Sequence, residues 1–106
     1  MAGALYIYCM RIISRQTLKE FWEKHRDVEA FLRQWLAQTH GLMWKSSMDI
    51  KRVHSTASFL SENRVVFNIK GNKYRLVAHV RYDLGRVYIR FVGTHAEYNR
   101  IDAATI

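Results

Sequence analysis

The spacing of apolar residues changes partway along this chain, from a helical period to an alternating one. Through about residue 53 apolar side chains recur every three or four residues, whereas from Ser58 they alternate with polar ones. A period near 3.6 is typical of an amphipathic helix, and a period of two is typical of a half-covered strand. The chain has 106 residues, no proline and no recognisable repeat or linker. We therefore expect one α+β unit, with helices first and then a sheet that they cover.

Two helices are expected in the first half. The segment "SRQTLKEFWEKH" carries apolar and aromatic side chains at helical spacing, which predicts a helix over residues 15–25. A second helix is predicted to begin with Asp27 as its N-cap and to end at Gly41, because apolar residues between them recur at i, i+3, i+4, i+7 and i+8. "SSMDIKRV" predicts one or two further turns, capped by Ser46 or Ser47. The Trp and Phe side chains of these helices indicate core packing more than a cofactor site.

The second half is typical of an antiparallel meander. "RVVFNI", "NKYRLVAHVRY" and "RVYIRFV" are rich in β-branched and aromatic residues, and "KG" and "DLG" between them are usable hairpin turns. A short first strand, "RIIS", follows Met10, so residues 1–9 are predicted to be an N-terminal extension; the alternative is one long strand, "LYIYCMRII". The predicted fold is α+β, a single domain over residues 10–106, with an N-terminal strand and two helices packed on one face of an antiparallel sheet.

Charge and cysteine content narrow the functional classes. The net charge is +8, and residues 64–100 carry eight Lys or Arg against two acidic residues, Asp83 and Glu97. Such a basic half favours a polyanion or an acidic protein partner, and it also serves solubility. Cys9 is the only cysteine, which excludes a disulfide framework and favours the reducing cytoplasm. Since no apolar run reaches the length of a membrane span and no signal peptide is recognisable, we expect a cytoplasmic protein without a membrane partner.

Alternation along the last two strands predicts a basic face. In the first of them Tyr74 and Leu76 begin the side expected to face the core, and the opposite side is polar except for Val77. In the second, the side chains expected to face the core are those of Val87, Ile89 and Phe91. A solvated sheet face is the simplest interpretation, but aromatic rings and a histidine interleave with the charges, as they do on surfaces that bind phosphates and bases. The side chains expected to lie together on the uncovered face are those of Lys73, Arg75, His79, Arg81, Tyr88 and Arg90.

The stretch "FVGTHAEYN" is predicted to carry two polar rings to the rim of this face. We expect Gly93 to let the strand break off and Thr94 to cap a short turn or helix, "HAEYNRI". His95 and Tyr98 are three residues apart and would then share one side of that helix. Alone, each is more often a structural hydrogen-bonding residue than a catalyst, so the neighbouring arginines carry the functional interpretation.

The C-terminal motifs resemble those of a known family. "NKYRLVAHV" followed by "VYIRFVGTHAEY" is similar to the HigB-type toxins of the RelE/ParE superfamily, the toxin half of type II toxin-antitoxin pairs. Family members similarly open with "R-I-I-S", continue through "L-K-E-F-W-E-K-H", and close with "F-N-I-G-G-N-K-Y-R-L-V" and "Y-I-R-F-V-G-T-H-A-E-Y-D-K-I-D". The resemblance extends from Met10 to the last residue. It implies a RelE-like microbial ribonuclease fold and an mRNA interferase that cuts translated messages.

The resemblance also implies roles for particular residues. Arg75 matches the Arg of "Y-R-L-V" that contributes to the active surface of RelE-like toxins, and His95 stands where relatives keep a basic catalytic residue after "V-G-x". Tyr98 fits the aromatic position near the C-terminus. Two departures stand out: Lys70 replaces the first Gly of "N-I-G-G-N", and Asn99 replaces the Asp of "E-Y-D", which would weaken activity if that carboxylate orients the His or Tyr in relatives.

Metal-free RNA cleavage needs the residue types that this face offers. The ribose 2′-OH attacks the adjacent phosphate, so a base must take one proton, cations must stabilise the phosphate, and an acid must protonate the departing 5′ oxygen. Guanidinium groups of Arg75 and Arg90 could hold phosphoryl oxygens bidentately. His95 is the expected acid, and Lys73 and Tyr98 are both candidates for the base. The residues expected to bind RNA or phosphate are Arg90, Arg81, His79, Tyr88, Asn68, Asn72 and Lys70.

No metal or other cofactor is expected. The nine carboxylates are scattered, with no paired acidic set near the basic face, and the five histidines lack the spacing of a zinc site. The partners implied by the resemblance are mRNA, the ribosome and a cognate helix-turn-helix antitoxin. Two alternatives stay open on sequence alone: a non-catalytic RNA- or DNA-binding module that uses the same face, and a ParE-like toxin that acts on a protein target.

Overall fold

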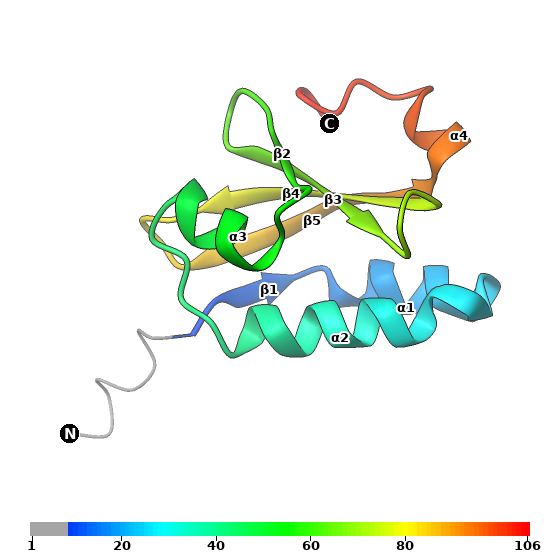
Figure 1. Cartoon of the computed structure of the whole chain (residues 1–106), viewed down its shortest axis with the longest axis horizontal. Helices are drawn as coiled ribbons and strands as arrows, with labels where there is room; N and C mark the ends of the chain where they lie inside the picture. The colour runs from blue at the N-terminus through cyan, green and yellow to red at the C-terminus, as the bar shows by residue number, and fades with distance from the viewer. Residues whose placement is uncertain (1–8) are drawn as a thin grey trace.

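The two halves of the chain form two layers, as the change of period predicts. The computed structural model describes residues 9–106, and Figure 1 shows helices α1 and α2 on one side of a five-stranded sheet. A 3₁₀ turn, Arg26–Val28, joins the two helices. The remaining elements, in chain order, are β1 (Arg11–Ile13), α1 (Arg15–Lys24), α2 (Glu29–His40), α3 (Ser47–Val53), β2 (Ser58–Phe59), β3 (Arg64–Ile69), β4 (Tyr74–Arg81), β5 (Arg86–Thr94) and α4 (His95–Tyr98).

The strand order is β1-β5-β4-β3-β2. Strands β2 to β5 form the predicted antiparallel meander. The first strand, however, joins β5 in parallel, with Ile12 opposite Val87, so the sheet is mixed and not wholly antiparallel. A parallel pair needs a long connection, and here the helices and the meander supply it. The α+β class and the helical cover are confirmed.

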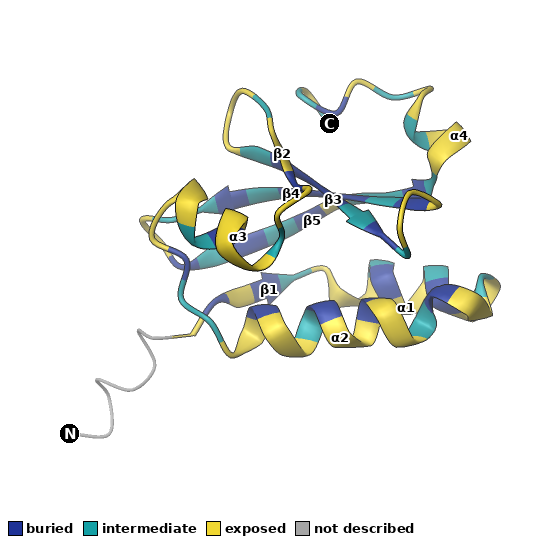
Figure 2. Cartoon of the chain, viewed as in Figure 1, coloured by how far each residue is buried: buried dark blue, intermediate teal, exposed yellow. Residues whose placement is uncertain are grey.

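The main core lies between the sheet and the helices. Figure 2 shows that α1 and α2 turn their buried sides toward the sheet and their exposed sides outward. Trp35 packs edge-on against Phe67 at 5.3 Å, and Trp44 stacks on the same ring at 6.0 Å. From β4, the side chains predicted to face the core do so: Tyr74, Leu76, Ala78 and Val80 are buried and Tyr82 packs beside them. Trp22 and Trp35 of the helices therefore serve packing, whereas Phe31 of α2 is exposed.

A second, smaller core lies on the opposite face of the sheet and was not predicted. Val66 and Val77 are buried there beneath the segment that follows α4, whose Ala103 is also buried. Phe91 and Ile106 pack against the same cluster. Figure 1 shows this C-terminal segment crossing above the sheet, on the side away from α1 and α2. The uncovered face expected from alternation is therefore partly covered by the chain itself.

A β-bulge changes the facing of β5. Val77 pairs with Phe91, but the next residue, Ala78, pairs with Ile89, so Arg90 is an extra residue in β5. Val87 and Ile89 face the main core as predicted, whereas the prediction for Phe91 is wrong, because the bulge turns it to the other face. Strict alternation would have required one residue fewer in this strand.

Several boundaries differ from the prediction. Helix α2 begins after Val28, and Asp27 lies in the 3₁₀ turn and does not cap the helix. Gly41 is the C-cap of α2, and Ser46 is the N-cap position of α3, as predicted. The expected extension, residues 1–9, lies outside the described residues except for Cys9, which is exposed. Among the helices of residues 9–106, none has the length and apolarity needed to span a bilayer.

Candidate active site

Except for Arg81, the residues predicted to form one basic face fall into three groups in the structure. The apolar stripe of Val66, Val77 and Phe91, with the C-terminal segment over it, divides the open face of the sheet into two. We call the group nearest α4 the Arg75 cluster: Asn72, Arg75, His95 and Tyr98. We call the group across the stripe the His79 cluster: Arg64, His79, Tyr88 and Arg90. The third, the Asp27 cluster, joins the hairpin turn to the helical layer: Asp27, Lys70, Lys73 and Tyr74.

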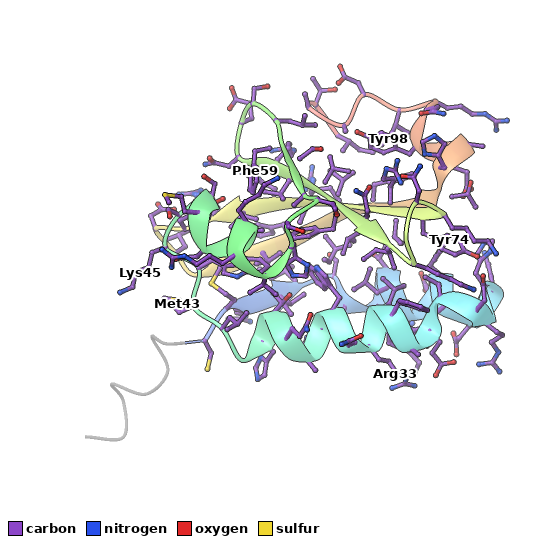
Figure 3. All side chains as sticks on the ribbon, in the orientation of Figure 1. Arg33, Met43, Lys45, Phe59, Tyr74 and Tyr98 are labelled. Atoms are coloured by element: carbon purple, nitrogen blue, oxygen red, sulfur yellow. The ribbon has the colours of Figure 1, made fainter. Side chains whose placement is uncertain are left out.

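In the Arg75 cluster, a guanidinium lies beside a phenol ring. The Cζ atom of Arg75 is 5.7 Å from the ring centroid of Tyr98, which is within the range of a cation–π contact. Arg75 Nη1 also donates to the main-chain oxygen of Asn72 at 3.1 Å, so the guanidinium is held from two directions. Gly93 lies opposite Arg75 on β5, and its missing side chain makes room for the Phe91 ring and for Glu97 Oε1. Tyr98 is labelled above the sheet in Figure 3, on the side away from the helices.

Thr94 caps helix α4, as predicted, and forms a capping box with Glu97 that was not predicted. Glu97 N donates to Thr94 Oγ1 at 3.1 Å, and Thr94 N donates to Glu97 Oε1 at 2.8 Å. The bond from Thr94 N to the carboxylate favours the charged form of Glu97 and so lowers its pKa. His95 N donates to the main-chain oxygen of Lys73 at 3.0 Å, which fixes the start of α4 against β4. His95 is exposed and Tyr98 half-buried, so both side chains are accessible from solvent.

In the His79 cluster, aromatic rings and cations form one row across three strands. Arg64, His79 and Tyr88 are consecutive neighbours on β3, β4 and β5, and the rings of His79 and Tyr88 lie 5.9 Å apart. Partial burial, and then the charges of Arg64, Arg90 and Arg81, lower the pKa of His79. His79 is therefore a neutral ring at neutral pH, able to stack or to hydrogen-bond.

In the Asp27 cluster, one carboxylate holds both lysines of the hairpin turn. Asp27 Oδ2 accepts from Lys73 Nζ at 2.7 Å and Lys70 Nζ at 3.0 Å, and Oδ1 accepts from the Tyr74 hydroxyl at 2.7 Å. These bonds hold the pKa of Asp27 well below its usual range, and the bond from Lys73 has the largest effect. The same contact raises the pKa of Lys73, and burial together with Asp27 raises that of Tyr74. Lys73 is thus kept charged and turned toward the helices.

Two further predicted residues are engaged elsewhere. Arg81 pairs bidentately with Asp83, at 3.0 and 2.8 Å, which raises the pKa of its guanidinium. Asn68 lies opposite Arg75 on β3, but its amide donates to the oxygen of Thr56 at 3.2 Å. It also lines a cavity of about 130 Å³ beside Trp35. This cavity lies away from the Arg75 cluster, whose surface is open.

Arg64 and Asp27 belong to these clusters but were not among the site residues predicted from the sequence. Arg64 could have been found, because Arg64, Val66 and Asn68 alternate in "RVVFNI" as the polar face of β4 does. Asp27 could not, since its partners are 43 to 47 residues away along the chain. Within residues 9–106, no three His, Cys, Asp or Glu side chains gather into a group that could hold a metal ion.

Comparison with known proteins shows which family this chain matches. Residues 27–101 match the family model described as HigB toxin, a RelE-like toxic component of a toxin-antitoxin system. The chain is 30% identical over 95 residues to the mRNA interferase toxin HigB of Escherichia coli K12, covering 85% of this chain and 88% of that protein. The mRNA interferase HigB of Shigella flexneri matches with the same identity and coverage. The matched region contains all three clusters.

Proposed function

The chain belongs to the HigB family of RelE-like toxins, and from this premise we propose that it is the toxin of a type II toxin-antitoxin pair, a metal-independent endoribonuclease that cleaves mRNA during translation. The observation that carries the proposal is the Arg75 cluster: a guanidinium, a phenol and an imidazole-bearing helix brought to one end of an open sheet face. The E. coli and Shigella relatives are named mRNA interferases, which supports the proposal.

The reaction assigns one role to each group of the cluster. The 2′ oxygen of a ribose bonds to the adjacent phosphorus while the bond from phosphorus to the 5′ oxygen breaks, leaving a 2′,3′-cyclic phosphate and a 5′-hydroxyl. Arg75 stabilises the negative charge that gathers on the phosphoryl oxygens, which are its bidentate acceptors. His95 gives a proton to the departing 5′ oxygen. Asn72 lies at the turn beside Arg75, where a base or ribose would pass.

Tyr98 takes the role of general base in this proposal. Lys73 was the other candidate, but an amine must be neutral to accept a proton, and Asp27 keeps this one charged. Tyr98 accepts the 2′-OH proton as the phenolate, and its ring already faces the phosphate-binding guanidinium. Lys70 and Lys73 then act as charges at the edge of the substrate path.

The remaining partners follow from the family. We infer that the substrate is presented on the ribosome, that a cognate helix-turn-helix antitoxin silences the toxin, and that the protein works in the cytoplasm, where translated mRNA is found. The basic second half of the chain suits all three surfaces: message, ribosomal RNA and an acidic antitoxin segment.

Induced expression tests the proposal. The intact chain should arrest growth and leave mRNAs cut within their coding regions, as mapped by sequencing of 5′ ends. Arg75→Ala and His95→Ala should each lower cleavage by about 10²-fold or more, since each removes a group that stabilises the transition state. Lys19→Ala, a loss of equal charge on the exposed side of α1, should leave cleavage unchanged.

The same variants separate the alternatives. A non-catalytic binding module would arrest growth without cutting RNA, and His95→Ala would change nothing. A toxin with a protein target would leave message ends intact in every variant. Either result, with folded protein confirmed by circular dichroism, would overturn the ribonuclease proposal.

A further inference from the structure

Two arginines of the His79 cluster donate hydrogen bonds to the same main-chain oxygen of the protein. Arg64 donates to the Ile106 oxygen through Nε at 3.0 Å and Nη2 at 2.8 Å, and Arg90 donates to it through Nε at 3.3 Å. Two parallel N–H groups of one guanidinium on a single oxygen, with a second guanidinium beside it, form a site for an anionic oxygen. In the folded chain, the C-terminal segment fills this site.

The surroundings of this oxygen offer contacts for a nucleotide as well as for a phosphate. Across the strands from Arg64 lie the rings of His79 and Tyr88, both half-exposed and 5.9 Å apart. His79 is neutral because burial and the neighbouring arginines lower its pKa. A neutral ring beside fixed cations suits a base that stacks while its phosphate binds the guanidinium groups.

The spacing between this site and the Arg75 cluster suits one continuous strand. Arg75 and His79 are four residues apart on β4, which places their Cα atoms about 13 Å apart. Between them lies the apolar stripe with Val77, under the C-terminal segment. A single nucleotide cannot reach both clusters, whereas a strand a few nucleotides long can.

We propose that Arg64 and Arg90, with His79 and Tyr88, form a second RNA subsite, in which a backbone phosphate of the substrate strand replaces the Ile106 oxygen. The proposal rests on the proposed function, because it takes the strand cut at the Arg75 cluster as the occupant. The exchange keeps the guanidinium groups hydrogen-bonded, since a phosphate oxygen accepts from the same N–H groups, and a base stacked on His79 and Tyr88 adds to it. The C-terminal segment is then a cover that long RNA displaces.

Binding of uncleavable RNA tests the subsite. Fully 2′-O-methylated strands lack the attacking hydroxyl, so binding can be measured without turnover. A dinucleotide and a strand several nucleotides longer are titrated by NMR into the full chain over a series of salt concentrations. The longer strand should bind more tightly, and Arg64→Ala or Arg90→Ala should reduce its salt slope by about 0.7 for each phosphate that the variant no longer neutralises. Either variant should weaken binding of the longer strand more than binding of the dinucleotide.

Two controls separate this role from a structural one. Arg64→Lys keeps the charge and should recover part of the affinity for the longer strand, but not all of it, because an ammonium cannot bind bidentately. Lys19→Ala should alter neither strand's binding. Equal losses for both strands in Arg64→Ala, or a long strand that binds no better than a dinucleotide, would overturn the subsite.

Failure of the subsite and failure of the ribonuclease proposal give different results. If the protein cuts no RNA at all, the 2′-O-methyl titration still reports whether Arg64 and Arg90 bind strand phosphates. If cleavage is found but length dependence is absent, the Arg75 cluster acts alone and the C-terminal segment is a fixed part of the fold.

Discussion

At the scale of single residues, Asp27 decides which lysines of the hairpin turn are available for chemistry. Its carboxylate binds Lys70, Lys73 and the hydroxyl of Tyr74 together, 2.7 to 3.0 Å from each. Sequence alternation alone would leave Lys73 pointing freely from the open face. The carboxylate removes it from the list of candidate bases and ties the turn to the helical layer.

Asp27→Asn should destabilise the protein in a pH-dependent way. The folded state holds the pKa of Asp27 below its unfolded value, so its stabilising contribution is complete above about pH 4 and disappears as the pH falls through the folded pKa. Urea unfolding at a series of pH values should show the variant less stable at pH 7, with the gap narrowing below pH 4. Glu23→Gln, which removes an exposed charge from α1, should show no such narrowing. A gap independent of pH would contradict the assignment.

Gly93 matters for the space it leaves and not for a break in the strand, since β5 continues through it. A Cβ atom there would lie 2.5 Å from the Phe91 ring and 3.1 Å from Glu97 Oε1. Gly93→Ala should therefore push Phe91 out of the smaller core and loosen the capping box of α4, at a cost of about 1–3 kcal/mol. Thermal denaturation measures this. Gly41→Ala, where the nearest atom is 3.5 Å away, is the control and should cost less.

At the scale of elements, the sequence predicts β4 better than β5. All of β4 alternates without interruption, so both of its faces could be assigned from the sequence. In β5 the bulge reverses the facing after Ile89, and no residue type in "YIRFVG" marks it. Alternation already places Val66 and Val77 on the open face, but the contribution of Phe91 to the apolar stripe and the C-terminal cover over it could not be predicted. For the same reason, the basic face was expected to be continuous although it is divided.

Deletions can test the bulge. Removing Arg90 should be tolerated, because Ile89 and Phe91 then occupy consecutive ladder positions and keep the faces they already have. We expect the free energy of unfolding to fall by about 1 kcal/mol, the contribution of the hydrogen bond from Arg90 to Ile106. Removing Tyr88 shortens the same strand equally but forces Val87 outward or Arg90 inward, so it should cost about 3 kcal/mol or more. Chemical denaturation of both variants gives the comparison. Similar costs in the two would argue against an extra residue at position 90.

At the scale of the whole molecule, the sheet is covered unequally on its two faces. Two helices and most of the buried side chains lie on one side, whereas the other carries α4 and a short segment with one buried residue, Ala103 (Figure 2). The active surface that we propose occupies the thinly covered face. Local opening requires less free energy where few apolar contacts hold a segment, so this cover should move without unfolding the sheet.

Hydrogen exchange should show this difference in local stability. The amides of Thr105 and Ile106 both donate to the Asp102 oxygen, and the only other described bonds on the Ile106 main chain are those from Arg64 and Arg90. These amides should exchange orders of magnitude faster than those of β4, which open only with global unfolding. Added long 2′-O-methyl RNA should speed their exchange further if phosphate takes the Ile106 site. Exchange of residues 103–106 as slow as that of β4 would mean that the cover opens only when the protein unfolds, and the His79 cluster would then be closed to RNA in the folded protein.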